Sequence, residues 1–108
     1  MPEWSKSLRI SKHLPDAQIR RIRRALDKGK TAENAYLITL SSNEKNQLDI
    51  INTLYLRQDS LTGRLPLVVG VARDKKDAFE MVRDILCETL DKTGGADMRS
   101  YLLAQHRK

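Results

Sequence analysis

The residues of this sequence best suited to chemistry are cations, and they are concentrated in one short run. The segment IRRIRRALDKGK, residues 19–30, holds four arginines and two lysines against a single aspartate. Arginine binds phosphate oxygens through paired N–H groups, and each phosphate contact releases counterions, so such a run suits nucleic acid or another polyanion. The candidate binding residues are Arg20, Arg21, Arg23, Arg24 and Lys28.

Three interpretations of this basic run stay open. It forms a solvated helix face, it binds nucleic acid, or it binds an acidic protein. In the second case Lys6, Arg9 and Lys12 could reach neighbouring phosphates, and Trp4 could stack on a base. We expect no membrane binding, because the helix has only a narrow apolar stripe without bulky anchors.

A weaker candidate for anion binding is the segment GVARDKK, residues 70–76, where a strand is expected to meet a helix. Helix N-termini present unpaired N–H groups, and Arg73 and Lys76 would add positive charge. The glycine spacing matches neither the Walker loop nor the dinucleotide fingerprint. A single glycine at this place, Gly70, is more typical of close packing.

The residues that serve as nucleophiles, bases and metal ligands are sparse. His13 and His106 lie near the two ends of the chain, outside any catalytic signature, and no spacing indicates a metal site. Cys87 is expected to be a surface thiol among acidic residues, and Glu88 and Lys92 a solvent-exposed pair. We therefore predict no catalytic residues, no metal, no cofactor and no enzymatic activity.

Length and charge suggest how the chain is organised. It has 108 residues and a net charge of +6, and residues 1–30 hold nine Lys or Arg against three Asp or Glu, while the remainder holds 11 of each. This asymmetry predicts a basic N-terminal extension with one helix, residues 1–33, joined to a small α/β domain, residues 34–108. A single cysteine and the absence of a signal-peptide pattern indicate a cytoplasmic location.

The hydrophobic pattern predicts the elements that position these residues. Helices are expected from Pro15 to Gly29, over 44–58, over 74–93 with Asp74 as N-cap, and over 97–105. Apolar runs at 35–40 and 65–72 predict strands, and 7–11 is a possible third strand. A strand, a helix and a strand form a crossover with parallel strands. The predicted fold is α/β, with a two- or three-stranded, mainly parallel sheet that could be completed across a dimer.

From about residue 34 onward, the chain resembles a group of short uncharacterised bacterial proteins. The resemblance rests on LITLSSNEKNQLDI, on LPLVVGVARDKKDAFEMVRDIL and on KTGGADMRSYLL. It implies that residues 34–108 form the domain, and it assigns no activity and no functional residue.

The sequence thus predicts a small, non-catalytic binding or regulatory module that self-associates as a homodimer. The alternative is a nucleic-acid-binding protein that contacts phosphates through its basic N-terminal helix.

Overall fold

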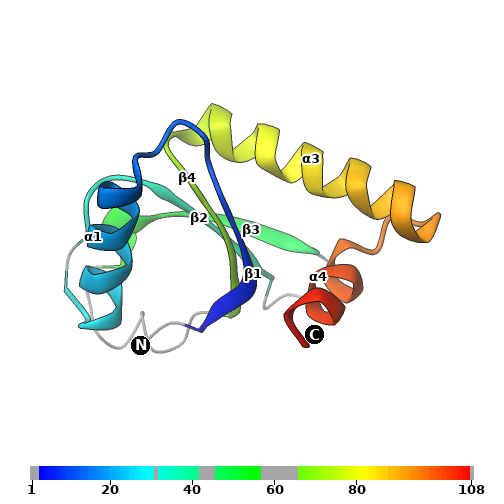
Figure 1. Ribbon diagram of the computed structural model, residues 1–108, viewed down its shortest axis with the longest axis horizontal. Coiled ribbons are helices and arrows are strands. Elements are labelled where there is room, and N and C mark those ends of the chain that lie inside the picture. Colours follow the sequence, from blue (N-terminus) through cyan, green and yellow to red (C-terminus); the bar gives the residue numbers. More distant parts are fainter. Residues whose placement is uncertain (1–2, 31, 42–45, 57–65, 108) are drawn as a thin grey trace.

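A four-stranded sheet carries helices on both of its faces (Figure 1). This computed structural model describes residues 3–30, 32–41, 46–56 and 66–107. The strands are β1 (Trp4–Ile10), β2 (Tyr36–Leu40), β3 (Leu48–Asn52) and β4 (Val68–Ala72). The helices are α1 (Asp16–Asp27), α3 (Lys75–Thr93) and α4 (Met98–Arg107), with a short 3₁₀ turn η1 (Thr53–Tyr55) after β3.

The strand order is β1-β4-β2-β3, so the last strand in the chain lies inside the sheet. Only β1 and β4 are parallel; β2 is antiparallel to both β4 and β3. The α/β class is therefore confirmed. The prediction of a two- or three-stranded, mainly parallel sheet is wrong, since there are four strands and most of the pairing is antiparallel.

The error comes from the helix predicted over 44–58. Residues 48–52 instead form β3, which pairs with β2 in register from Tyr36 opposite Asn52 to Leu40 opposite Leu48. The other residues of that predicted helix include 44–45 and 57–58, which lie outside the described residues. Because residues 48–52 are a strand antiparallel to β2, the predicted strand–helix–strand crossover is absent, and with it the reason to expect parallel strands.

The N-terminal residues contribute to the same sheet and core as the later elements. The possible strand at 7–11 is observed as β1, which pairs with β4 from Trp4 to Ile10. Helix α1 covers one face of the sheet, where Ile19, Ile22 and Leu26 are buried against Leu37 and other aliphatic residues. Sheet pairing and core packing therefore both extend across residue 33, the predicted boundary of the extension.

The opposite face of the sheet is covered by α3 and α4 (Figure 1). Ile38 and Val69 from the sheet meet Ile85 of α3 and Leu102 of α4 in a second buried cluster. Gly70 faces this cluster, and a Cβ built there would lie 2.6 Å from the Met81 sulfur. The expectation that Gly70 reflects close packing is confirmed.

The predicted helix boundaries near α3 are confirmed by their caps. The Asp77 N–H donates to Asp74 Oδ1 at 2.8 Å, which makes Asp74 the N-cap. Gly94 ends the helix in the left-handed region, with φ of 76°.

No helix in the described part of the chain has the length and apolar character needed to cross a bilayer.

Candidate functional site

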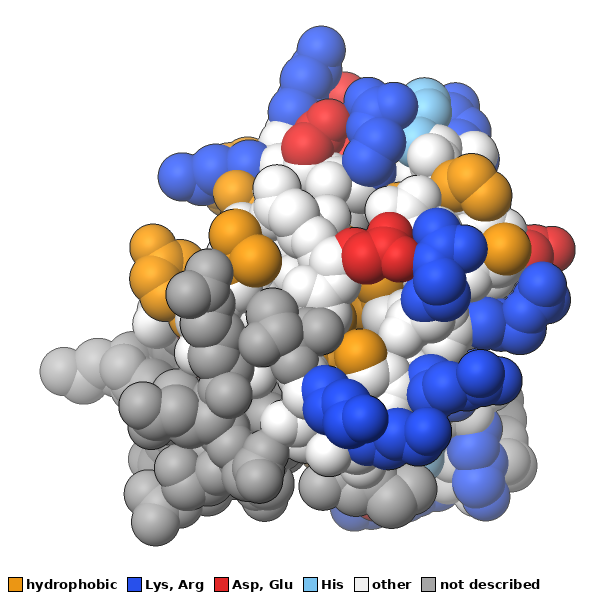
Figure 2. Space-filling model, turned by 90° about the vertical axis from the view of Figure 1, so that its left-hand side faces the viewer, with side chains coloured by type: hydrophobic (Ala, Val, Ile, Leu, Met, Phe, Trp, Pro, Cys, Tyr) orange, Lys and Arg blue, Asp and Glu red, His pale blue; other side chains and the backbone are white. Residues whose placement is uncertain are grey.

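Helix α1 presents a line of three unneutralised cations to solvent. Ile19, Ile22 and Leu26 point into the core. The opposite side carries exposed Arg20 and Arg24 and, at the C-cap, exposed Lys28, which we name together the α1 cationic row. Residues four apart lie on one side of a helix and rise by about 6 Å per step, so the row is about 12 Å long. Figure 2 shows Lys and Arg side chains gathered over this side of the molecule.

The two other predicted binding residues of α1 make contacts within the chain. Arg21 is exposed and forms an ion pair with Glu33, and this hydrogen bond holds the pKa of Glu33 below its ordinary value. The Arg23 guanidinium lies 5.0 Å from the centre of the Trp4 ring. Surface contacts of this kind contribute little to stability. Because Arg21 and Arg23 each have a partner within the chain, we do not count them in the α1 cationic row.

Trp4 is half-buried against α1 and does not lie in a free tail. Its Nε1 donates to Asp27 Oδ1 at 2.8 Å, while Arg23 covers its ring. These contacts fix β1 to α1. They occupy the ring that the sequence suggested for stacking on a base.

Arg9, suggested as an extra phosphate contact, is turned inward and paired with a carboxylate. Its Nη2 lies 2.6 Å from Glu88 Oε2 on α3, and the Tyr101 hydroxyl donates to the same carboxylate at 2.7 Å. These contacts, led by the Arg9 hydrogen bond, lower the pKa of Glu88 to about 2. Glu88 is thus the centre of a cluster that joins β1, α3 and α4. The sequence had instead suggested a solvent-exposed pair of Glu88 with Lys92.

The 70–76 junction contains its own carboxylates at the helix N-terminus. The Arg73 N–H donates to Asp77 at 2.9 Å, and the Asp77 N–H donates to Asp74. The Arg73 guanidinium also pairs with Asp74, and Lys76 is exposed. The chain's own carboxylates therefore accept hydrogen bonds from two of the N–H groups at this junction, those of Arg73 and Asp77.

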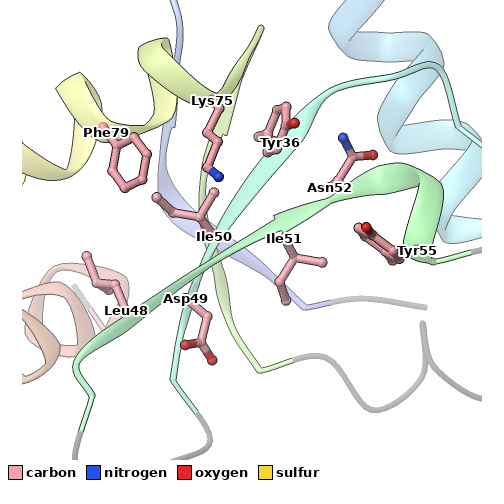
Figure 3. A pocket seen from close by; sticks show the side chains of 9 residues that line it. All are labelled: Tyr36, Leu48, Asp49, Ile50, Ile51, Asn52, Tyr55, Lys75 and Phe79. Atoms are coloured by element: carbon pink, nitrogen blue, oxygen red, sulfur yellow. The ribbon is translucent and has the colours of Figure 1, made fainter.

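A groove follows β3, a feature that the sequence did not indicate. It is an open groove of about 700 Å³ lined by all of β3 with residues from β2, η1 and α3. Figure 3 shows Lys75 and Phe79 reaching from α3 over Ile50, with Tyr55 at one end. Phe79 is 55% exposed and Tyr55 is 76% exposed, so an apolar surface remains open beside an edge strand. The groove could not be predicted from the sequence, because its lining strand β3 was predicted to be part of a helix over 44–58.

The remaining candidates for chemistry stand apart from one another. Cys87 is exposed, as expected, while His106 accepts a hydrogen bond from the Lys6 N–H on β1. His13 lies beside Asp74 and Asp77 in a small, mixed-charge hollow. Among the described residues, no three His, Cys, Asp or Glu side chains come together in a metal-binding arrangement.

Comparisons with known proteins add no relative. No family model matches the chain, no curated protein matches it, and no solved structure matches it. The resemblance of residues 34–108 to a bacterial group stays a prediction.

Proposed function

We propose that this chain is a non-catalytic binding module and that the α1 cationic row binds the phosphates of a nucleic acid. The observation that carries the proposal is the row itself: Arg20, Arg24 and Lys28 are exposed, aligned and outside every ion pair among the described residues. A solvated structural helix needs no such alignment, because charges of both signs serve equally well.

The length of the row fits a polyanion. Along one strand of duplex DNA the phosphates are ~3.4 Å apart in the direction of the axis, so a row of about 12 Å spans roughly three to four phosphates of that strand. The charge is also one-sided, since the apolar stripe of α1 is buried in the sheet. Helix α1 therefore has one free face, and apart from Asp16 in the first turn the exposed charges on that face are basic. An acidic protein is the competing partner, and the experiment separates the two.

The test measures binding to a generic 20-base-pair DNA duplex by fluorescence anisotropy across a salt series. We expect dissociation constants on the order of 10⁻⁶ to 10⁻⁴ M that weaken steeply with salt. The triple variant Arg20→Ala, Arg24→Ala, Lys28→Ala should reduce the slope of log K against log salt by about 3.

A matched control removes the same charge elsewhere. Arg83, Lys92 and Arg107 are exposed on α3 and α4, across the sheet from α1. Changing all three to Ala should leave most of the affinity intact. Equal losses in the two triple variants would overturn the assignment to α1. Binding of poly-glutamate as tight as that of DNA would overturn the assignment to nucleic acid and favour an acidic protein.

A further inference from the structure

Strand β3 is the last strand of the sheet on one side in the part of the chain that the structure describes. Its five residues pair with β2 without a bulge, all five are partly exposed, and among the described residues no strand lies on its other side. Such edges pair readily with other strands, and proteins usually block them with charges, prolines or bulges. Strand β3 carries one charge, Asp49, and neither a proline nor a bulge.

The opposite edge of the sheet has the protection that β3 lacks. Strand β1 changes register between Trp4 and Arg9. The Lys6 N–H is bonded to His106, and the Ser7 N–H is bonded to the Ser5 hydroxyl. Helix α4 lies beside this edge (Figure 1). In the described residues the two edges therefore differ, because β1 has a register shift and side-chain hydrogen bonds while β3 has neither on its outer side.

The backbone of β3 shows which groups are free. Bonds from the Ser41 N–H to Gln47 and from the Thr53 N–H to Ala35 flank the ladder with β2. Antiparallel bonding alternates along a strand, so the odd-numbered residues of β3 bond to β2. The N–H and C=O groups of Leu48, Ile50 and Asn52 therefore point to the open edge.

These three residues are spaced symmetrically about Ile50, and we propose that two copies of this chain pair through antiparallel β3 strands centred on Ile50. In this register Ile50 exchanges hydrogen bonds with the partner's Ile50, and Leu48 with the partner's Asn52. Every outward backbone group of the strand then has a partner. Asp49 lies opposite the partner's Ile51, so no like charges face each other directly.

The side chains around the groove also suit a second copy. Ile50 and Phe79 lie on one face of the strand (Figure 3), so the symmetry axis brings apolar side chains from both copies together. Lys75 disfavours this dimer, because the Lys75 ammonium groups of the two copies approach the same symmetry axis and repel each other. We therefore expect association to strengthen as salt screens this repulsion, the opposite of the salt dependence of nucleic-acid binding.

A dimer of this kind also has a consequence for α1. The twofold axis stands perpendicular to the joined sheet, so both copies keep α1 on the same face. Two cationic rows then point to one side, and a single polyanion can contact both at once, which raises avidity. The pairing of β3 itself does not depend on nucleic-acid binding and is tested without it.

Disulfide trapping in a Cys87→Ser background tests the register. Paired Cα atoms at position 50 would lie ~5.5 Å apart, inside the ~4.4–6.8 Å that a disulfide spans. We expect Ile50→Cys to form covalent dimers on mild oxidation. Asp49→Cys alone should form no covalent dimer, since its two copies would be ~7–8 Å apart, while a mixture of Asp49→Cys and Ile51→Cys should cross-link. Cross-linking of Asp49→Cys alone as efficiently as the mixture would overturn the register.

Sedimentation equilibrium tests the association without cysteines. Ile50→Pro removes an outward N–H that β2 does not use, and edge strands tolerate such a proline. We expect the wild-type chain and Ile50→Ala to dimerise and Ile50→Pro to remain monomeric, with circular dichroism checking that each variant is folded. A wild-type chain that stays monomeric at millimolar concentration, or an association that weakens with salt, would overturn the proposal.

Discussion

Arg9 on β1 holds Glu88 on α3 through two guanidinium nitrogens, Nη1 at 3.1 Å from Oε1 and Nη2 at 2.6 Å from Oε2. The Tyr101 hydroxyl of α4 donates to the same carboxylate. One carboxylate therefore joins the first strand to the last two helices. Bidentate pairs of this kind fix geometry as well as charge.

The Glu88 cluster predicts a stability that depends on pH. The pKa of Glu88 is lowered from 4.5 to about 2, chiefly by the Arg9 hydrogen bond, so its contribution is complete above pH 4.5 and is lost as pH falls toward 2. Because the side chain is 34% exposed, we discount the full shift to roughly 1–2 kcal/mol. Urea unfolding at pH 6 and pH 3 should show this extra acid loss in the wild type but not in Glu88→Gln.

A matched substitution on the same helix serves as the control for this pH dependence. Glu80→Gln removes a carboxylate that lies in no ion pair among the described residues. It should lose stability between pH 6 and pH 3 as the wild type does. Parallel curves for the wild type and Glu88→Gln would contradict the role of Glu88.

The end of α3 predicts a difference between two adjacent glycines. Gly94 has φ of 76°, while Gly95 lies outside the left-handed region. Gly94→Ala should lower the free energy of unfolding by about 1 kcal/mol, since a Cβ is strained there even though no atom lies within 4 Å. Gly95→Ala should be close to neutral in the same thermal or urea unfolding measurement. Equal effects would mean that the cap conformation does not limit stability.

The position of Trp4 predicts that the N-terminal region unfolds together with the rest of the chain. Trp4 is the only tryptophan, and it contacts Arg23 and Asp27 of α1. Its fluorescence and the far-ultraviolet circular dichroism should change at the same urea concentration. A fluorescence change at lower urea would instead support residues 1–33 as a separate extension.

Local patterns predicted helices α1 and α3 and their ends well. Helix α1 follows from a three-residue apolar stripe, and α3 from Asp74 at its start and Gly94 at its end. These signals depend on residues within one or two helical turns of each other, so a single sequence contains them in full.

Strand β3 was the element that the sequence misassigned. Leu48, Ile51 and Tyr55 share a helical face, but Ile50 lies off it, and in the structure Leu48 and Ile50 share one side of a strand. A short apolar run fits both the helical period of 3.6 residues and the strand period of two. Which structure this segment adopts depends on its pairing with β2. The groove was missed for the same reason.

The positions of some charged residues could be predicted from local spacing, and those of others could not. The outward face of α1 is visible in the helical spacing of its arginines. The inward turn of Arg9 is not, because its partner Glu88 is 79 positions away. Contacts over such separations follow from the fold as a whole, and no local signal distinguishes Arg9 from the cations that remain exposed.

The position of β4 within the sheet also constrains how the chain assembles during synthesis. Strand β4 lies between β1 and β2, although both precede it in the chain. Until residues 68–72 leave the ribosome, β1 has no strand beside it and only the β2–β3 hairpin can form. A lone hairpin is marginal in water, so we expect the four-stranded sheet to form only after residues 68–72 are available.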